Sequence, residues 1–122
     1  MVRKATLTAV LASLTSCSAL QMPAKRTSYY ALGNDPGWTL QIGRGITFAA
    51  STGNTYVETP AFALYRLVNG RRFATDRIIV DVFPAVCVDS RSGIAFADRV
   101  VVTTSNVTFR GCGGKRVPLL DK

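Results

Sequence analysis

Short runs in which apolar and polar residues alternate, separated by turn signals, limit most strongly what this chain can fold into. Side chains of a β-strand point alternately to opposite faces, so a two-residue period predicts a strand with one buried face. We expect strands at residues 28–32, 38–42, 46–50, 62–68, 71–75, 77–83, 97–103 and 107–112, and a weak one at 56–57. Short strands with frequent turns predict an all-β domain, a small antiparallel barrel or sandwich of about seven to eight strands.

Turn signals at three places sharpen this prediction. Residues 33–37 read G-N-D-P-G, in which Pro36 and Gly37 suit the two central positions of a type II turn. Asn69-Gly70 is a favoured pair for a type I′ hairpin turn. Pro84 cannot donate to a ladder, so it is expected either to end its strand or to mark a sheet edge.

The N-terminal residues have the pattern of a secretion signal. A short basic start with Arg3 and Lys4 precedes an apolar stretch, residues 5–15, that is too short to cross a bilayer as a helix. Residues 14–17, L-T-S-C, resemble the bacterial lipobox, and this implies cleavage before Cys17 and attachment of a diacylglycerol to its sulfur. An ordinary signal peptide cleaved near Ala19 is the alternative.

These features divide the chain into four parts. We expect a lipoprotein signal peptide at residues 1–16, a lipidated tether at 17–27, the all-β domain at 28–116 and a C-terminal tail at 117–122. The tether is polar and contains a proline and two basic residues, as is typical of a linker.

The chain has three cysteines, an odd number for a secreted protein. With Cys17 assigned to a lipid, Cys87 and Cys112 remain as a pair that an oxidising periplasm would allow to form a disulfide. Two free buried thiols are the alternative. A zinc site is disfavoured, because four-coordinate zinc needs more Cys or His ligands and the chain has no His.

The formal net charge of the chain is +8, and cleavage of the signal would remove two of its basic residues. The basic residues are scattered and form no stripe interleaved with aromatic residues, so we do not expect nucleic acid as a partner. In an envelope protein the nearer anions are lipid head groups, lipopolysaccharide phosphates and wall polymers. A merely solvated basic surface is the alternative.

Two motifs resemble a bacterial envelope domain. Residues 31–42, A-L-G-N-D-P-G-W-T-L-Q-I, are similar to its G-[TN]-[ED]-P-[FG]-W-x-[LV]-x-I signature. Residues 87–93, C-V-D-S-R-S-G, and 109–114, F-R-G-C-G-G, resemble its C-x-D-[SG]-M-S-x and [YF]-x-G-C segments, with Arg91 where many members have Met. The family is an uncharacterised one of small lipoproteins, sometimes adjacent to META/HslJ-like or lysozyme-inhibitor-like domains. The resemblance implies β architecture and an envelope location, and it carries no catalytic residues.

The residue types present do not indicate an enzyme. Without His, a Ser/His/Asp or Cys/His constellation is excluded, and we expect no catalytic residue, no metal and no cofactor. Asp89, Ser90 and Ser92 are expected to hydrogen-bond local backbone amides, and Asp35 to cap its turn. The same loops form the candidate binding site, which comprises Asp35, Trp38, Asp89, Ser90 and Ser92. Trp38 has two interpretations, a platform for a sugar ring or a core residue.

Three functional hypotheses follow. The first is a non-enzymatic envelope lipoprotein, lipid-anchored and facing the periplasm, whose domain binds or scaffolds an anionic envelope component or an envelope protein. Ser18 after Cys17 favours the outer membrane in a Gram-negative source. The second is a lysozyme-inhibitor-like protein, although a basic domain would be repelled by basic lysozymes. The third is a small hydrolase built on the carboxylates Asp35 and Asp89, with Asp98 as a further candidate.

Overall fold

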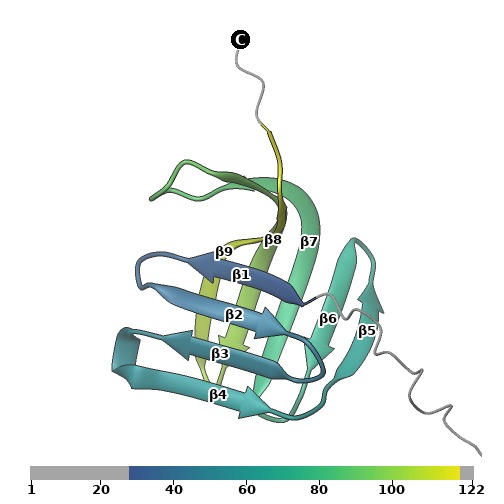
Figure 1. Ribbon diagram of the computed structural model, residues 1–122. Helices are drawn as coiled ribbons and strands as arrows, with labels where there is room; N and C mark the ends of the chain where they lie inside the picture. Colours follow the sequence, from purple (N-terminus) through teal and green to yellow (C-terminus); the bar gives the residue numbers. More distant parts are fainter. Residues whose placement is uncertain (1–27, 119–122) are drawn as a thin grey trace, which may run out of the picture.

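The computed structural model of the protein describes residues 28–118, which form one antiparallel β-sheet (Figure 1). The predicted signal peptide, the tether with Cys17 and the end of the predicted tail lie outside these residues. The elements are β1 (Tyr29–Gly33), β2 (Trp38–Ile42), β3 (Ile46–Ala50), the 3-10 helix η1 (Thr52–Asn54), β4 (Thr55–Thr59), β5 (Ala63–Leu67), β6 (Gly70–Ala74), β7 (Ile78–Val88), β8 (Ala95–Thr104) and β9 (Val107–Arg116). Across residues 28–118, no helix has the length and apolar character needed to span a bilayer.

The order of strands in the sheet is β4-β3-β2-β1-β9-β8-β7-β6-β5. The first and last strands therefore pair in the middle of the sheet, with Ala31 opposite Gly113 and Leu32 opposite Cys112. Figure 1 shows the sheet curled into a half-barrel, with β4 and β5 as its two edges. The predicted all-β antiparallel domain is confirmed. A single curled sheet takes the place of a two-sheet sandwich.

The core lies on the concave face of the half-barrel and is built by the alternation seen in the sequence. In β2, Trp38, Leu40 and Ile42 are buried while the two residues between them are exposed. Phe48 of β3 is fully buried, with its ring centroid 5.7 Å from that of Trp38 and 5.0 Å from that of Phe109. Burying each large apolar side chain contributes about 1.5–3 kcal/mol. The other fully buried side chains are Ile46, Ile78, Val80, Val82, Val100 and Val102.

The fourth strand is better formed than its sequence suggests. Only residues 56–57 were expected to be extended, whereas β4 pairs with β3 over its whole length, from Ile46 opposite Thr59 to Ala50 opposite Thr55. Val57 and Thr59 face the core, and Tyr56 and Glu58 are exposed. The strand is specified by the neighbour it pairs with, because its own residues are mostly polar.

Two of the three turn predictions are wrong in detail. In residues 33–37 the positive φ falls on Asp35, at 53°, and not on Gly37, and the Asp35–Pro36 peptide bond is cis, so the turn is not type II. The loop between β5 and β6 is Val68-Asn69, and neither residue has a positive φ, so it is not a type I′ turn at Asn69-Gly70.

The third turn signal, Pro84, lies inside β7 and does not end it. At this point β7 has a partner on one side only, because its ladder with β6 ends at Val82 opposite Arg71. Pro84 is opposite Asp98 of β8, and the register of that ladder shifts between Pro84 and Cys87. Pro84 therefore does not end its strand. It marks a local edge of the sheet, which is the second of the two expectations.

The irregular part of β7 and β8 places the candidate site. Beyond the register shift, the β7–β8 hairpin bends over the sheet, and Figure 1 shows it crossing above β1. The loop at its tip, residues 89–93, is thereby carried toward the β1–β2 turn. A loop can lie on the surface of the sheet in this way, because its backbone N–H and C=O groups can still bond to water or to side chains.

Candidate functional site

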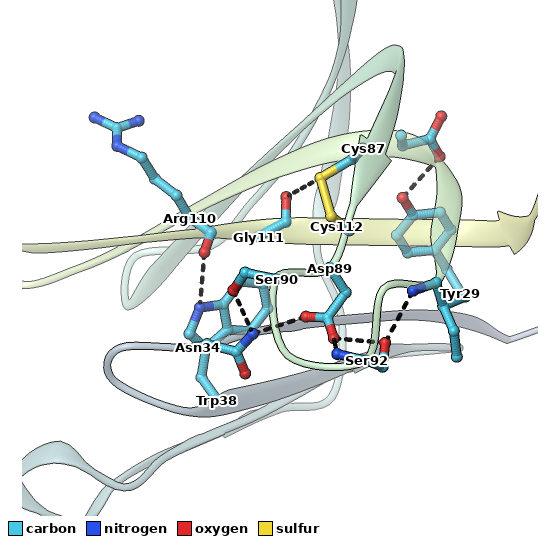
Figure 2. The surroundings of a disulfide bond; sticks show 12 residues. Tyr29, Asn34, Trp38, Cys87, Asp89, Ser90, Ser92, Arg110, Gly111 and Cys112 are labelled. Carbon is cyan, nitrogen blue, oxygen red and sulfur yellow. Dashed lines mark hydrogen bonds between the residues drawn. A yellow bond between two sulfur atoms is a disulfide. The ribbon is translucent and has the colours of Figure 1, made fainter. Parts of the chain in front are cut away.

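The β1–β2 turn (residues 33–37) contacts the loop at the tip of the β7–β8 hairpin (residues 89–93), and we call this contact the turn–loop junction. The side-chain amide of Asn34 donates to Asp89 Oδ1 at 2.8 Å and to Ser90 Oγ at 3.2 Å (Figure 2). The bonded residues are 55 and 56 positions apart in the chain. The junction is therefore a tertiary contact between two loops.

Asp89 also organises its own loop. Its Oδ2 accepts a hydrogen bond from the backbone N–H of Ser92 at 2.8 Å and another from the Ser92 hydroxyl at 2.7 Å. The backbone N–H of Gly93 donates to the carbonyl oxygen of Asp89 at 2.8 Å, and Gly93 has a φ of 76°, which favours glycine. These bonds are of the kind expected for an aspartate at the start of a turn.

Hydrogen bonding keeps the Asp89 carboxyl ionised. The bonds from the Ser92 hydroxyl and the Ser92 N–H, with a smaller contribution from Asn34, lower the pKa of Asp89, against the opposing effect of burial. Its residue is only 6% exposed. A general acid needs a pKa raised toward neutrality, so Asp89 has the properties of a structural carboxylate and not those of the acid that the hydrolase hypothesis requires.

The Cys87–Cys112 disulfide attaches the strand that leads into the 89–93 loop to the sheet. The two Cα atoms are 5.4 Å apart, and the bond joins β7, two residues before Asp89, to β9. Cys112 pairs with Arg99 of β8, so their side chains share a face of the sheet. Val100, which follows Arg99 in β8, points to the other face, into the core. The disulfide therefore lies on the convex face of the sheet, beneath the bent hairpin. The predicted pairing is confirmed.

Trp38 belongs to the core and presents no face to a ligand. It is 3% exposed, and its indole N–H donates to the carbonyl oxygen of Arg110 at 3.3 Å. Gly33 and Gly111 lie against its ring, where a Cβ at either position would collide with it. Of the two interpretations of Trp38, the structure has the core residue.

Two hollows flank the turn–loop junction. One, of about 380 Å³, is lined by both loops: Asn34, Asp35, Pro36, Gly37, Ser90 and Arg91. The other, of about 270 Å³, lies along β8 and β9 beside the disulfide and is bordered by the exposed residues Arg99 and Arg110. Arginine and hydroxyl side chains in such hollows can bind anionic or polar groups by charge-assisted hydrogen bonds.

The structure brings together most, but not all, of the predicted site residues. Asp89, Ser90 and Ser92 share the loop, and the exposed Asp35 lines the hollow between loop and turn. Asn34, which was not predicted, connects the two loops. No local pattern identifies it, because its partner Asp89 lies 55 residues away.

A second polar cluster lies on the concave face at the edge of the core. The Tyr29 hydroxyl donates to Asp98 Oδ2 at 2.8 Å. Burial, together with the hydrogen bond to Asp98, raises the pKa of Tyr29 above its ordinary value, so this phenol stays protonated. Asp98 is thus hydrogen-bonded to Tyr29 of β1, and not to the β1–β2 turn or the 89–93 loop. Among residues 28–118 no group of three or more His, Cys, Asp or Glu side chains is placed to hold a metal ion.

Comparisons of the chain with models of protein families, with curated proteins and with solved structures found no match.

Proposed function

We propose that this protein is a non-enzymatic binding module of a bacterial cell envelope, anchored by a lipid on Cys17 and facing the periplasm. The observation that carries the proposal is the disulfide. Because Cys87 and Cys112 are joined to each other, Cys17 is the one cysteine of the sequence left for another role. Disulfides are typical of exported proteins, and Cys17 ends the lipobox-like sequence L-T-S-C.

The character of the turn–loop junction supports binding over catalysis. Its carboxylate, Asp89, is fully engaged by Ser92 and Asn34 and has a lowered pKa. The exposed groups around it, Ser90 and Arg91, can form hydrogen bonds without proton transfer. A loop held by hydrogen bonds and a disulfide loses little conformational entropy on binding, which favours affinity.

Metabolic labelling with radioactive palmitate in the native host tests the anchor. We expect the full chain to carry label and to sediment with membranes, and Cys17→Ala to lose both the label and the membrane location. The variant Cys87→Ala/Cys112→Ala is the matched control, since it removes the other two cysteines and is expected to keep the label.

In the same cells, a photo-crosslinking residue at Ser90 tests the junction as the binding surface. Ser105, exposed in the β8–β9 turn, is the control position. We expect a crosslinked product from Ser90 and none from Ser105. Labelled Cys17→Ala protein in the membrane fraction would contradict the anchor, and equal crosslinking at both serines would contradict the junction.

A further inference from the structure

The β5–β6 hairpin exposes an unusual amount of apolar surface. Val68 at its tip is 102% exposed and Leu64 is 59% exposed, while Tyr65, which is 54% exposed, points to the opposite face of the strand. β5 is an edge strand of the half-barrel, and four of its five residues are exposed. Exposed apolar residues gathered in one place mark an interaction surface, whereas single ones need no explanation.

Two arginines lie directly opposite each other on this hairpin. Arg66 of β5 pairs with Arg71 of β6 in the ladder, so both side chains are on the same face. Like charges in this arrangement are destabilising unless an anion lies between them. Across residues 28–118, Arg72 forms an ion pair, with Asp81 at 2.7 Å, and neither Arg66 nor Arg71 forms one.

Arg71 is held in place by aromatic rings. Its guanidinium carbon is 5.5 Å from the ring centroid of Tyr29 and 5.6 Å from that of Phe73. The carboxylate of Asp98 accepts a hydrogen bond from the Tyr29 hydroxyl. Stacking on aromatic faces leaves the N–H groups at the edge of a guanidinium available to bind an anion such as phosphate.

A hollow of about 600 Å³ lies on this hairpin, and it combines both kinds of surface. Its lining includes the two arginines together with Leu64, Leu67, Val68 and Pro84. Residues 59–75 contain three arginines and no Asp or Glu, and because Arg72 pairs with Asp81, the unbalanced charge is that of Arg66 and Arg71. Apolar side chains next to unbalanced positive charge are complementary to an anionic lipid surface.

The proposed lipid anchor is also connected to the domain close to this hairpin. The described residues begin at Ser28, directly before Tyr29, whose ring lies against Arg71. Residues 17–27 lead from there to the proposed anchor, and eleven residues span about 40 Å at most. A lipid on Cys17 therefore keeps the hairpin within reach of the bilayer surface.

We propose that the β5–β6 hairpin docks on an anionic phospholipid bilayer, with Arg66 and Arg71 binding head-group phosphates and Leu64 and Val68 entering the interfacial layer. The inference rests on the proposed function only in that the anchor supplies the membrane. Docking would orient the domain on the bilayer.

Vesicle flotation of the full chain carrying Cys17→Ser tests this docking without any lipid anchor, so that failure of the anchor and failure of the docking are separate results. Vesicles of phosphatidylcholine alone are compared with vesicles that also contain phosphatidylglycerol. We expect tighter binding to the anionic vesicles. Because each basic residue near a membrane contributes about fivefold in affinity, Arg66→Glu in this background is expected to weaken anionic-vesicle binding about tenfold or more.

A matched pair of valine variants tests the apolar tip. Val68→Asp is expected to weaken anionic-vesicle binding about as much as Arg66→Glu. Val107→Asp, at an exposed valine next to the β8–β9 turn, is expected to leave binding unchanged. The register aligns Val107 with Ile78 at the start of β7, whereas the tip of the β5–β6 hairpin lies beyond Val82. The side chains of Arg66, Val68 and Val107 are exposed, and circular dichroism checks that each variant folds.

Three results would overturn the proposal. The first is equal binding of the Cys17→Ser protein to neutral and anionic vesicles. The second is parent-like binding by both Arg66→Glu and Val68→Asp. The third is a change from dimer to monomer in Val68→Asp on sedimentation with no change in vesicle binding, which would assign the hairpin to self-association.

Discussion

Both carboxylate oxygens of Asp89 accept hydrogen bonds, one from Asn34 on the β1–β2 turn and the other from Ser92 in its own loop. Asp89 thereby connects two segments that no strand ladder joins. A buried carboxylate bonded to several donors is a stabilising feature only while it is ionised. The integrity of the turn–loop junction therefore depends on pH.

The sign of this dependence follows from the lowered pKa of Asp89. Because the folded protein releases this proton more readily than the unfolded chain, the stabilisation is complete above the ordinary Asp pKa of about 3.9. It is lost as the pH falls from there through the lower native pKa. We expect Asp89→Asn to reduce the free energy of unfolding by about 1–2 kcal/mol at about pH 7.

Urea unfolding of both proteins over a range of pH checks this prediction. The difference between parent and Asp89→Asn should shrink as the pH falls below about 4. Asp76→Asn, which changes an exposed aspartate before β7, serves as the control and should stay within about 0.5 kcal/mol of the parent. A constant difference between parent and Asp89→Asn at every pH would contradict the ionic role.

At the scale of the elements, the sequence predicts a strand well where apolar and polar residues alternate strongly. It predicts a strand poorly where pairing with a neighbouring strand determines the bounds or the course of that strand. Residues 38–42 and 46–50 were predicted with the observed bounds, because their own side chains form the core. β4 was underestimated, since it is ordered by its ladder with β3. The bend in β7 after Pro84 depends on the register with β8, which no local pattern encodes.

The candidate site shows the same division. The local part, the hydrogen bonds of Asp89 with Ser92, follows from turn chemistry within four residues of sequence. The tertiary part, the Asn34 contact, requires knowledge of how β7 and β8 bend. The β5–β6 hairpin itself was predicted, but the pairing of Arg66 with Arg71 was not, because it depends on a loop at Val68-Asn69, one residue earlier than expected.

The central strand β9 accepts only glycine where it passes Trp38. A Cβ on Gly111 would be 2.7 Å from Trp38 Cζ2 and would also collide with the carbonyl oxygen of Leu32 on β1. We expect Gly111→Ala to lower the free energy of unfolding by about 1–3 kcal/mol, the usual cost of overpacking. Gly37→Ala is the matched control, because its Cβ would be 4.0 Å from its nearest neighbours and Gly37 has no positive φ.

Urea unfolding of the two glycine variants gives the comparison. Gly37→Ala should equal the parent or exceed it slightly, since alanine reduces the freedom of the unfolded chain. Equal stability of Gly111→Ala and Gly37→Ala would contradict the close packing of Trp38 against β9.

For the whole molecule, the disulfide is the one covalent link between the bent hairpin and the sheet in the described residues. It closes a loop across 25 residues, for which the chain-entropy model gives about 3–4 kcal/mol. A small domain has a modest core, so this is a large part of its stability.

The lysozyme-inhibitor hypothesis stays a prediction, since no described contact bears on it.

Reduction should therefore unfold the protein at a lower urea concentration. We expect Cys87→Ala/Cys112→Ala to lose about 3–4 kcal/mol of unfolding free energy. The reducing agent should lower the stability of the parent by a similar amount and leave that of the double variant unchanged. A parent that is unaffected by complete reduction, verified by thiol titration, would show that the bond adds nothing to the stability of the sheet.

The pairing of β1 with β9 has a consequence for how the chain reaches its native state. Seven of the eight ladders among residues 28–118 join strands that follow each other in sequence, and the β1–β9 ladder alone joins the two ends of the domain. Two meanders, β1–β4 and β5–β9, can thus form from local contacts, and their meeting across β1 and β9 carries the entropic cost of closing a long loop. A circular permutant opened between β4 and β5, with residue 118 joined to residue 28, would have strand order equal to sequence order, and we expect it to fold faster than the natural chain.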